Sequence, residues 1–320
     1  MSQAALKIFC LFLVPIPAVC QIRWKNVDSA FGPLPASVHV YFSNDSLDQK
    51  PSRAYYMSAR LDDRKLEFTA DTSMGRRLQP RAFFEKNGKP LAVVNCTFFS
   101  FETNRNLNVV LRDHRLLSYN VHSIAGRGRD TFTFRHPLTS AIGLTSGRRA
   151  DVAWVFTDSS LRHAYAVQCP VQPHRDSSAR FTLAHAIHGC KGGCRLRKWK
   201  MQTAVGGGPA LLQNGEICIT NNEELKFAGR AILDRHPRTA MGYTADDRLI
   251  ILVIEGRNAN AAGATLVQTA QILRELGCIE ALNLDGGGSS CLLVNGKETI
   301  RVSDGSQRPV PAVFIVKTID

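Results

Sequence analysis

A carboxylate, three glycines and two hydroxyl groups follow one another near the end of the chain: Asp285, Gly286, Gly287, Gly288, Ser289 and Ser290. An apolar, strand-like run at 279–284 leads into them. Consecutive glycines let a ligand approach the bare backbone, and their amides can form a concave nest for an anion. The stretch therefore predicts a binding site with Asp285 at its rim. A glycine turn that Asp285 simply caps is the alternative.

A second glycine segment, formed by Gly206, Gly207 and Gly208, lies earlier in the chain. Each segment is followed by an apolar run and an Asn-Gly pair, at 214–215 and at 295–296. Asn-Gly strongly favours a β-hairpin, and a third pair at 87–88 predicts another one. The pseudo-repeat predicts two glycine loops at similar strand ends, although an accidental likeness between two hairpins remains open.

The order of the elements brings two carboxylates toward one edge of a sheet. An apolar run at 249–254 predicts a strand that ends just before Glu255. A capping box and leucines at helical spacing predict a helix over 265–276, and the strand at 279–284 then ends at Asp285. If the two strands pair in parallel through this crossover, both carboxylates share the edge where open α/β sheets bind ligands.

Short apolar runs separated by turns dominate the rest of the chain and predict an α+β fold. We expect a β-rich mixed sheet with few helices, in a single domain over residues 21–320. The expected strands lie at 38–42, 91–95, 107–111, 152–156, 211–219, 249–254, 281–284, 292–300 and 313–316.

Further short motifs accompany the glycine segments: Ala-Val-Gly-Gly-Gly-Pro at 204–209, Arg-Thr-Ala-Met-Gly at 238–242, Leu-Ile-Ile-Leu-Val-Ile-Glu-Gly-Arg at 249–257, Gly-Ala-Thr-Leu at 263–266 and Arg-Pro-Val at 308–310. This ordered set resembles the phosphodiester glycosidase family, most strongly over 203–316. The segment Val-Asn-Cys-Thr-Phe-Phe at 94–99 is similar to the family's Asn-Gly-Gly-Tyr/Phe-Phe, with both glycines replaced.

The resemblance implies a glycosidase-type hydrolase that cleaves a glycosyl phosphodiester between the anomeric carbon and the phosphate. Diesters of N-acetylglucosamine 1-phosphate, or a related cell-surface or exopolysaccharide glycan, are the implied substrates. Because a phosphate monoester has a second pKa of about 6, it leaves with little protonation, and cations can replace the general acid.

Roles for individual residues follow from the resemblance. Asp285 and Glu255 are the candidate catalytic carboxylates, as base or nucleophile. Structural salt bridges are the alternative role for the arginines. The residues expected to bind substrate are Asn95, Gly206, Gly207, Gly208, Arg238, Arg257, Gly286, Gly287, Gly288, Ser289, Ser290 and Arg308.

Three alternatives to this function and mechanism exist. A serine nucleophile would need Gly-x-Ser-x-Gly and a later histidine, and none follows His236. A non-catalytic binding protein for anionic glycans or polyanions would keep the pocket for recognition only. A hydrolase of unphosphorylated polysaccharide would need two carboxylates at glycosidase separation and no arginine cluster.

The composition indicates a globular protein, and its positive charge fits either an anionic partner or a role in solubility alone. The 320 residues are 44% hydrophobic, and 40 basic against 27 acidic residues give a net charge of +13. The densest basic run, at 195–200, contains one aromatic residue, and no nucleic-acid-binding motif is present. We therefore expect no nucleic acid partner, and no cofactor.

The N-terminus has the layout of a secretory signal, with Lys7, an apolar run at 8–14 and small residues near position 20. We expect a signal peptide over 1–20, cleaved near Cys20 or after Ala18, and a secreted or periplasmic protein. Lipid attachment at Cys20 is the alternative, although Val19 fits it poorly. The run is far shorter than the roughly 20 residues of a membrane-spanning helix, so no membrane span is expected.

Nine cysteines occur, and removing Cys10 and Cys20 with the signal would leave an odd number. At least one free thiol is therefore expected in an oxidising compartment. Cys169 is expected to pair with Cys190 or Cys194 in polar loops, whereas the apolar surroundings of Cys218, Cys278 and Cys291 predict buried thiols. A zinc site is the less expected alternative, because the spacing of its four ligands is irregular: His185, His188, Cys190 and Cys194.

Overall fold

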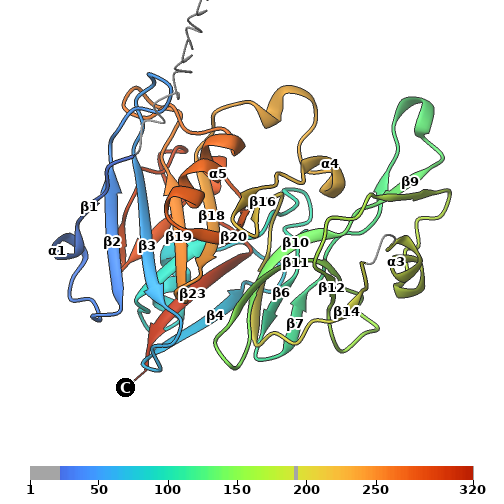
Figure 1. Cartoon of the computed structure of the whole chain (residues 1–320), viewed down its shortest axis with the longest axis horizontal. Helices are drawn as coiled ribbons and strands as arrows, with labels where there is room; N and C mark the ends of the chain where they lie inside the picture. Colours follow the sequence, from blue (N-terminus) through green and yellow to red (C-terminus); the bar gives the residue numbers. More distant parts are fainter. Residues whose placement is uncertain (1–21, 191–193, 320) are drawn as a thin grey trace, which may run out of the picture.

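The computed structural model describes residues 22–190 and 194–319, so the predicted signal peptide lies outside the described residues. Four β-sheets dominate the structure (Figure 1). The largest has eight strands in the order β1 (Lys25–Asn26), β2 (Val38–Ser43), β3 (Ala54–Arg60), β19 (Arg248–Ile254), β18 (Arg238–Thr244), β20 (Cys278–Asn283), β16 (Ala210–Gln213) and β17 (Glu216–Ile217).

The other three sheets pack beside it or extend from it. The seven-stranded sheet has the order β14 (Arg197–Lys198), β12 (Tyr165–Val167), β11 (Ala150–Phe156), β10 (Thr139–Leu144), β15 (Thr203–Gly206), β6 (Val110–Arg112) and β7 (Arg115–Ser118). The five-stranded sheet has the order β22 (Lys297–Glu298), β21 (Leu292–Val294), β5 (Ala92–Asn95), β23 (Ala312–Thr318) and β4 (Leu66–Thr72). The three-stranded sheet consists of β13 (His174–Asp176), β9 (Phe134–His136) and β8 (Ile124–Ala125).

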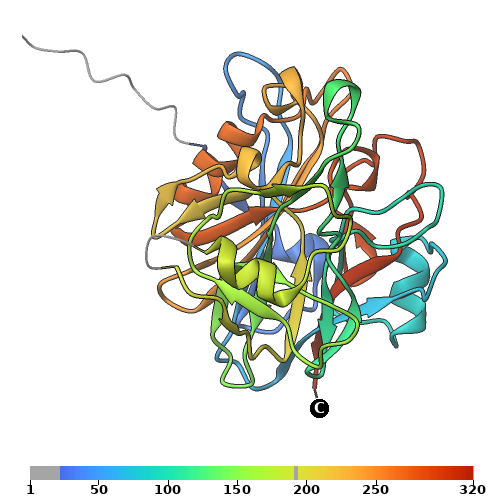
Figure 2. The same ribbon diagram turned by 90° about the vertical axis from the view of Figure 1, so that its right-hand side faces the viewer.

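Helices are few and short. They are α1 (Asp28–Phe31), α2 (Pro80–Lys86), α3 (Leu183–Gly189), α4 (Asn221–Glu224) and α5 (Leu266–Glu275), with 3-10 turns at Gly128–Asp130, Gly229–Ile232 and Gly287–Ser289. Figure 2 shows α3 in front of the seven-stranded sheet. In the described part of the chain, no helix is long and apolar enough to cross a membrane.

The central core lies where the three larger sheets meet, and it draws buried side chains from each of them, including Ile251, Phe314 and Ile142. Strand β19 is apolar throughout because both of its faces are buried. Its odd-numbered residues from 249 to 253 belong to the central core, and its even-numbered residues from 250 to 254 belong to a second core that also contains the apolar face of α5. The capping box that begins α5 is present as predicted, with Thr265 Oγ1 accepting from Gln268 N at 3.1 Å.

The β-rich, helix-poor prediction is confirmed, and every expected strand run contains a strand. The hairpins at Asn214 and Asn295 form, with positive φ at both residues of each Asn-Gly pair. The predicted hairpin at Asn87 is wrong, because that Asn-Gly pair instead ends α2. Residues with positive φ terminate helices as readily as they form hairpins, so the motif alone did not distinguish the two.

The predicted parallel pairing of the strands at 249–254 and 279–284 is also wrong. Strand β18 lies between β19 and β20 and pairs antiparallel with both, and every pairing among the described strands is antiparallel. Because β19 and β20 flank one antiparallel neighbour, they still run in the same direction. Glu255 and Asp285 therefore follow strand ends on the same edge of the sheet, as the sequence predicted, for a different topological reason.

Candidate active site

Asp285 lies in a loop whose backbone is fixed by the end of strand β5. Its amide donates to Cys96 O at 2.8 Å, and Asn95 Nδ2 donates to Asp285 O at 2.6 Å. The side-chain oxygen of Asn95, Oδ1, accepts hydrogen bonds from Thr239 Oγ1 at 2.9 Å and from Cys291 N at 3.0 Å. Asn95 is completely buried, so its geometry is that of a positioning residue rather than of the predicted substrate contact.

The Asp285 side chain has an unusual protonation equilibrium. Burial raises its pKa from 3.8 to about 7, although hydrogen bonds from the Ser289 hydroxyl and the Gly286 amide and the charge of Arg308 act in the opposite direction. The residue keeps partial solvent exposure. A carboxyl group with these properties can hold or release a proton near neutral pH, which is typical of catalytic acids and bases.

This pKa predicts a pH-dependent difference in stability between the protein and Asp285→Asn. Because the folded-state pKa lies above the unfolded value, the stabilising contribution is present at acidic pH and is lost as the pH rises from about 4 through about 7. At about 1.4 kcal/mol per pKa unit, the ionised carboxylate costs at most about 4 kcal/mol. Thermal melts should show similar stability for the two proteins at pH 4 and a higher Tm for the asparagine variant at pH 8. A difference that is independent of pH would contradict the assigned pKa.

Arg257 packs directly against the glycines of the Asp285 loop. A Cβ atom on Gly287 would lie 3.1 Å from Arg257 Nη2, a tight contact, and the φ of +61° at this position favours glycine. Arg257 itself has a φ of +63°, a conformation that non-glycine residues rarely adopt and that is often found at functional sites. Its side chain is exposed, and no ion-pair partner for it occurs in the ranges that the structure describes. This cation is therefore available to an anionic ligand.

Arg308 reaches the same loop from the segment after strand β22. A Cβ atom on Gly288 would lie 2.1 Å from Arg308 Nη2, and Arg308 Nη1 lies 3.4 Å from Ser289 Oγ. Unlike Arg257, it forms an ion pair, with Nη2 at 2.6 Å from Asp304 Oδ2. Asp304 lies in a turn and orients this arginine.

Arg238, the third predicted arginine, is buried, and its guanidinium donates hydrogen bonds to two backbone carbonyl groups. Nε donates to Ala264 O at 2.8 Å and Nη2 donates to Asp234 O at 2.9 Å, and burial lowers its pKa to about 10. These two bonds hold the loop that carries His236. The Nδ1 atom of His236 lies 3.4 Å from Arg257 Nη2. Burial and the two neighbouring arginines lower the pKa of His236, so this half-buried imidazole is neutral at pH 7. Sequence motifs did not identify His236 as a site residue.

The amides of Gly206, Gly207 and Gly208 do not form the expected anion nest. Gly206, Gly207 and Gly208 are buried, and their amides donate to Val109 O, Ser140 O and Asn283 O at 2.8, 3.0 and 2.7 Å. In the second loop, the Gly287 amide donates to Pro237 O at 2.8 Å. The glycines permit close packing instead, since a Cβ atom on Gly207 would lie 2.5 Å from Asn283 O. The two glycine loops therefore meet through the end of β20.

Glu255 is buried, and both of its carboxylate oxygens are engaged by the protein. Oε1 accepts from Asn258 Nδ2 and Oε2 accepts from Arg301 N, each at 3.0 Å, and Arg53 Nε lies 3.7 Å from Oε2. These contacts fix the turn that carries Arg257. The geometry therefore supports a structural role for Glu255 in place of the catalytic role predicted from the sequence.

A second buried carboxylate, Glu224, lies directly beneath Gly208, and no sequence motif marks it. It accepts five hydrogen bonds from four residues: Ser140 N, Ser140 Oγ, Ala210 N, Thr220 Oγ1 and Trp154 Nε1, at 2.7 to 3.2 Å. Burial lowers the pKa of the neighbouring Lys226 to about 8. Glu224 thus links the eight-stranded and seven-stranded sheets at the base of the Gly206–Gly208 loop.

Two buried polar atoms near Asp285 have no hydrogen-bond partner within the described residues: Ser290 Oγ and Asn283 Oδ1. Buried polar groups are nearly always paired, with protein or with ordered water. Ser289 and Ser290 therefore differ in role, because only Ser289 bonds to the Asp285 carboxylate.

The structure also decides between the alternatives for the cysteines. Cys169 pairs with Cys194, one of the two predicted partners, so Cys194 is removed from the possible zinc ligands. His185 instead completes the capping box of α3, and no cluster of three or more metal-binding side chains occurs in the described ranges. Cys278 and Cys291 are buried as predicted, whereas Cys218 is half-buried.

Comparisons of sequence identify related proteins. A family model described as phosphodiester glycosidase matches residues 88–317. A prophage-derived uncharacterized protein of Bacillus subtilis is 41% identical over 76 residues, which are 24% of this chain and 12% of that protein. The N-acetylglucosamine-1-phosphodiester alpha-N-acetylglucosaminidase of mouse is 29% identical over 105 residues, which are 30% of this chain and 20% of the relative. The chain thus spans a fifth or less of the length of these curated relatives.

Comparisons of structure show the same fold. A hypothetical protein from Synechocystis superposes with a TM-score of 0.61 at 16% identity, over 93% of this chain and 64% of that one. The zebrafish N-acetylglucosamine-1-phosphodiester alpha-N-acetylglucosaminidase catalytic domain, auto-inhibited by its pro-peptide, superposes with a TM-score of 0.58 at 16% identity, over 93% and 89%. Together with the family match over most of the chain, these likenesses show that the chain belongs to the phosphodiester glycosidase family, whose members are glycosidase-type hydrolases.

Proposed function

We propose that the chain is an exported hydrolase that cleaves glycosyl phosphodiesters between the anomeric carbon and the phosphate oxygen, with Asp285 as its catalytic carboxylate. One observation carries the proposal: Asp285, a residue with partial solvent exposure and a carboxyl pKa of about 7, lies in the same loop against which Arg257 and Arg308 pack. Diesters of N-acetylglucosamine 1-phosphate are the proposed substrates, in line with the names of the mouse and zebrafish relatives.

The charges of Asp285, Arg257 and Arg308 match the charges that develop during this reaction. As the bond between the anomeric carbon and the phosphate oxygen breaks, positive charge grows on the sugar and the electron pair passes to the phosphate. An ionised Asp285 stabilises the first charge, or attacks the carbon directly, while Arg257 and Arg308 stabilise the second. Water then supplies the hydroxyl group to the sugar, and its proton passes to Asp285 or to solvent.

Glu255 already has partners for both carboxylate oxygens, and this distinguishes the proposal from hydrolysis of an unphosphorylated polysaccharide. Ordinary glycosidases use two carboxyl groups, one of them as the acid that protonates a sugar-alcohol leaving group. Here the second predicted carboxylate is held by Arg53, Asn258 and the Arg301 amide. A phosphate leaving group removes the need for that acid, because it departs as a stable anion.

A matched pair of substrates tests the proposed function. The methyl phosphodiester of N-acetylglucosamine 1-phosphate should be hydrolysed with a kcat/KM at least about 100-fold above that of methyl N-acetylglucosaminide, because hydrogen bonds to charged groups contribute about 1.5–3 kcal/mol each. Arg257→Gln should reduce this preference, whereas Arg274→Gln, an exposed arginine on α5, should leave it unchanged. Equal rates on the two substrates would refute the phosphate specificity. Tight binding of the diester without turnover would favour the binding-protein alternative.

Export is supported by the N-terminal sequence and by the Cys169–Cys194 disulfide, because disulfides persist mainly outside the cytosol. Native protein should therefore have the mass of a chain beginning near Gln21, and its mass should increase on reduction and alkylation of the disulfide. Intact-mass spectrometry measures both quantities. A full-length chain in which Cys169 and Cys194 are both reduced would contradict the proposal.

A further inference from the structure

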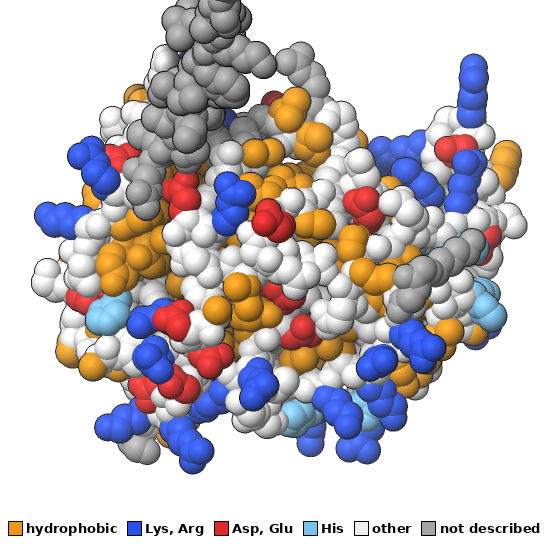
Figure 3. Space-filling model, viewed as in Figure 1, with side chains coloured by type: hydrophobic (Ala, Val, Ile, Leu, Met, Phe, Trp, Pro, Cys, Tyr) orange, Lys and Arg blue, Asp and Glu red, His pale blue; other side chains and the backbone are white. Residues whose placement is uncertain are grey.

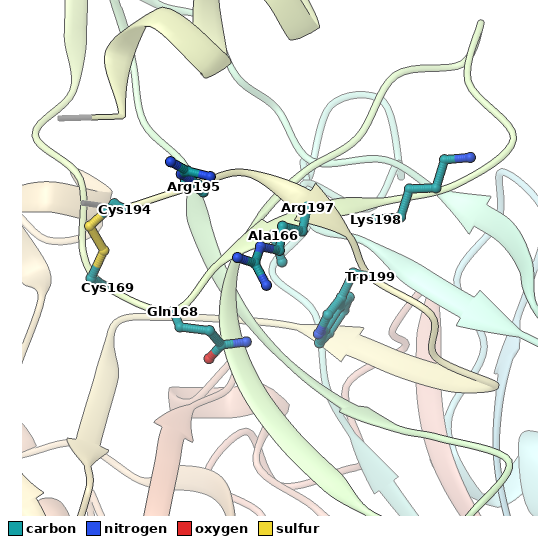
Figure 4. Close-up of a pocket in the computed structure, with 8 residues that line it drawn as sticks. All are labelled: Ala166, Gln168, Cys169, Cys194, Arg195, Arg197, Lys198 and Trp199. Carbon is teal, nitrogen blue, oxygen red and sulfur yellow. A yellow bond between two sulfur atoms is a disulfide. The ribbon is translucent and has the colours of Figure 1, made fainter. Parts of the chain in front are cut away.

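Two neighbouring cavities flank the edge strand β14, and none of the residues that line them belongs to the Asp285 site. Their volumes are about 690 and 620 Å³, and Lys198 and Trp199 line both. Figure 4 shows the first cavity, with Arg195 and Arg197 above Gln168 and with Lys198 extending in the opposite direction from Arg195. We call the two cavities together the basic groove.

The basic groove carries an excess of positive charge, although the Asp151 carboxylate lies beside it and accepts hydrogen bonds from Gln168 Nε2 and Trp199 Nε1. Five exposed cations line it: Arg162, Arg195, Arg197, Lys198 and Lys200. No carboxylate lines either cavity, and none of the five cations forms an ion pair with another residue in the described ranges. Figure 3 shows basic side chains gathered along the lower right of the molecule, where histidines lie among them. Like charges held this close repel one another, and an anionic ligand relieves that repulsion.

The backbone holds these cations in a fixed order. Strand β14 pairs with β12, with Lys198 opposite Tyr165 and Arg197 opposite Ala166. Arg195 and Arg197 line the first cavity, Lys200 lines the second, and Lys198 lines both. The Cys169–Cys194 disulfide lies at the end of the first cavity, next to Arg195. The groove is therefore a structured surface and not a flexible basic tail.

The remaining lining residues favour a carbohydrate over other anionic partners. Trp199 is only 5% exposed and its Nε1 donates to Asp151 Oδ2 at 2.5 Å, so it offers no free face for stacking on a nucleobase. None of the exposed large hydrophobic side chains of the described residues lines the groove, which leaves nothing to insert into a membrane. Gln168, Thr145 and Ser146 do line it; they already bond to Asp151, Arg149 and His114, and their remaining hydrogen-bonding capacity suits sugar hydroxyls.

We propose that the basic groove binds an anionic polysaccharide, through its sulfate, phosphate or carboxylate groups, at a site separate from the catalytic one. The exposed guanidinium groups of Arg195 and Arg197 match oxyanions in geometry, and the two cavities accept successive charged groups of one chain. This site does not depend on the proposed hydrolase activity. It would concentrate the protein on an anionic glycan whether or not that glycan is cleaved.

Binding to dextran sulfate, with neutral dextran of the same length as reference, tests the proposal on the full chain. Dextran sulfate contains no glycosyl phosphodiester, so the result is independent of catalysis. The triple variant Arg195→Gln, Arg197→Gln and Lys198→Gln should raise the Kd for dextran sulfate at least about ten-fold and make its salt dependence shallower. Neutral dextran should not bind.

The matched control removes the same charge elsewhere. Lys25→Gln, Lys50→Gln and Arg274→Gln replace three exposed cations outside the groove, and this variant should bind dextran sulfate as the unmodified protein does. An equal loss of affinity for dextran sulfate in the two triple variants would show that only net charge matters, and it would overturn the proposal. Tighter binding of double-stranded DNA than of dextran sulfate would reassign the groove to nucleic acid. Groove-dependent co-sedimentation with phosphatidylglycerol vesicles, without binding to dextran sulfate, would reassign it to a membrane surface.

Discussion

Asp285→Asn is expected to lower kcat on a glycosyl phosphodiester by about 10³-fold or more. A fixed carboxylate stabilises the positive charge that develops at the anomeric carbon, and a neutral amide of the same shape cannot do so. Because the carboxylate is the active form in this mechanism, activity of the unmodified protein should rise with pH and level off above the Asp285 pKa of about 7. A chromogenic sugar phosphodiester, assayed from pH 5 to 9, gives both quantities.

Ser290→Ala is the control for this prediction. Ser290 lies in the same loop and is buried, but its hydroxyl has no partner among the described residues. Loss of one neutral hydrogen bond to substrate, worth about 0.5–1.5 kcal/mol, should cost roughly ten-fold or less. If Asp285→Asn kept near-normal turnover and Ser290→Ala were inactive while both remained folded, the serine would replace the carboxylate as the catalytic group.

Glu224→Ala is expected to cause the largest loss of stability, about 3–5 kcal/mol. The substitution leaves buried donors without an acceptor, among them the Ala210 amide and the Trp154 indole, and it leaves Lys226 without its neighbouring charge. Because Glu224 also underlies Gly208, the loop that packs on the end of β20 should loosen, and activity should fall together with stability. Urea denaturation at constant pH measures the free energy of unfolding.

Glu223→Ala provides the comparison in the same helix. Glu223 is only partly buried and accepts one hydrogen bond, from Gln172 Nε2 at 3.2 Å. Its replacement should change the free energy of unfolding by less than about 0.5 kcal/mol. A loss below 1 kcal/mol in Glu224→Ala, or equal losses in both variants, would show that Glu224 does not link the sheets as described.

The strands could be predicted because their signal is local. Apolar runs such as 249–254 become strands buried on both faces, and the Asn-Gly pairs at 214–215 and 295–296 turn the chain back. The insertion of β18 between β19 and β20 could not be predicted in the same way, since strand order depends on contacts between distant segments. The hydrophobic pattern alone predicted a β-rich domain, and the family resemblance added only that this domain is similar to the phosphodiester glycosidases.

In the candidate site, too, the features with a local signal could be predicted and those that depend on distant contacts could not. Its position at the end of β20 followed from the sequence, because glycines next to a carboxylate are informative wherever they occur. The function of each glycine did not follow, because sequence cannot show that the amides of 206–208 are already bonded to neighbouring strands. Glu224 and His236 were missed because their importance arises from burial and from neighbours far away in the chain.

The most direct test of the central claim is the fate of oxygen during hydrolysis. The methyl phosphodiester of N-acetylglucosamine 1-phosphate would be incubated with the protein in ¹⁸O-labelled water, and the released methyl phosphate would be analysed by mass spectrometry. Cleavage between the anomeric carbon and the phosphate oxygen predicts methyl phosphate without ¹⁸O, since water adds to the sugar. Incorporation of ¹⁸O into the phosphate product would show attack at phosphorus and would contradict the glycosidase mechanism.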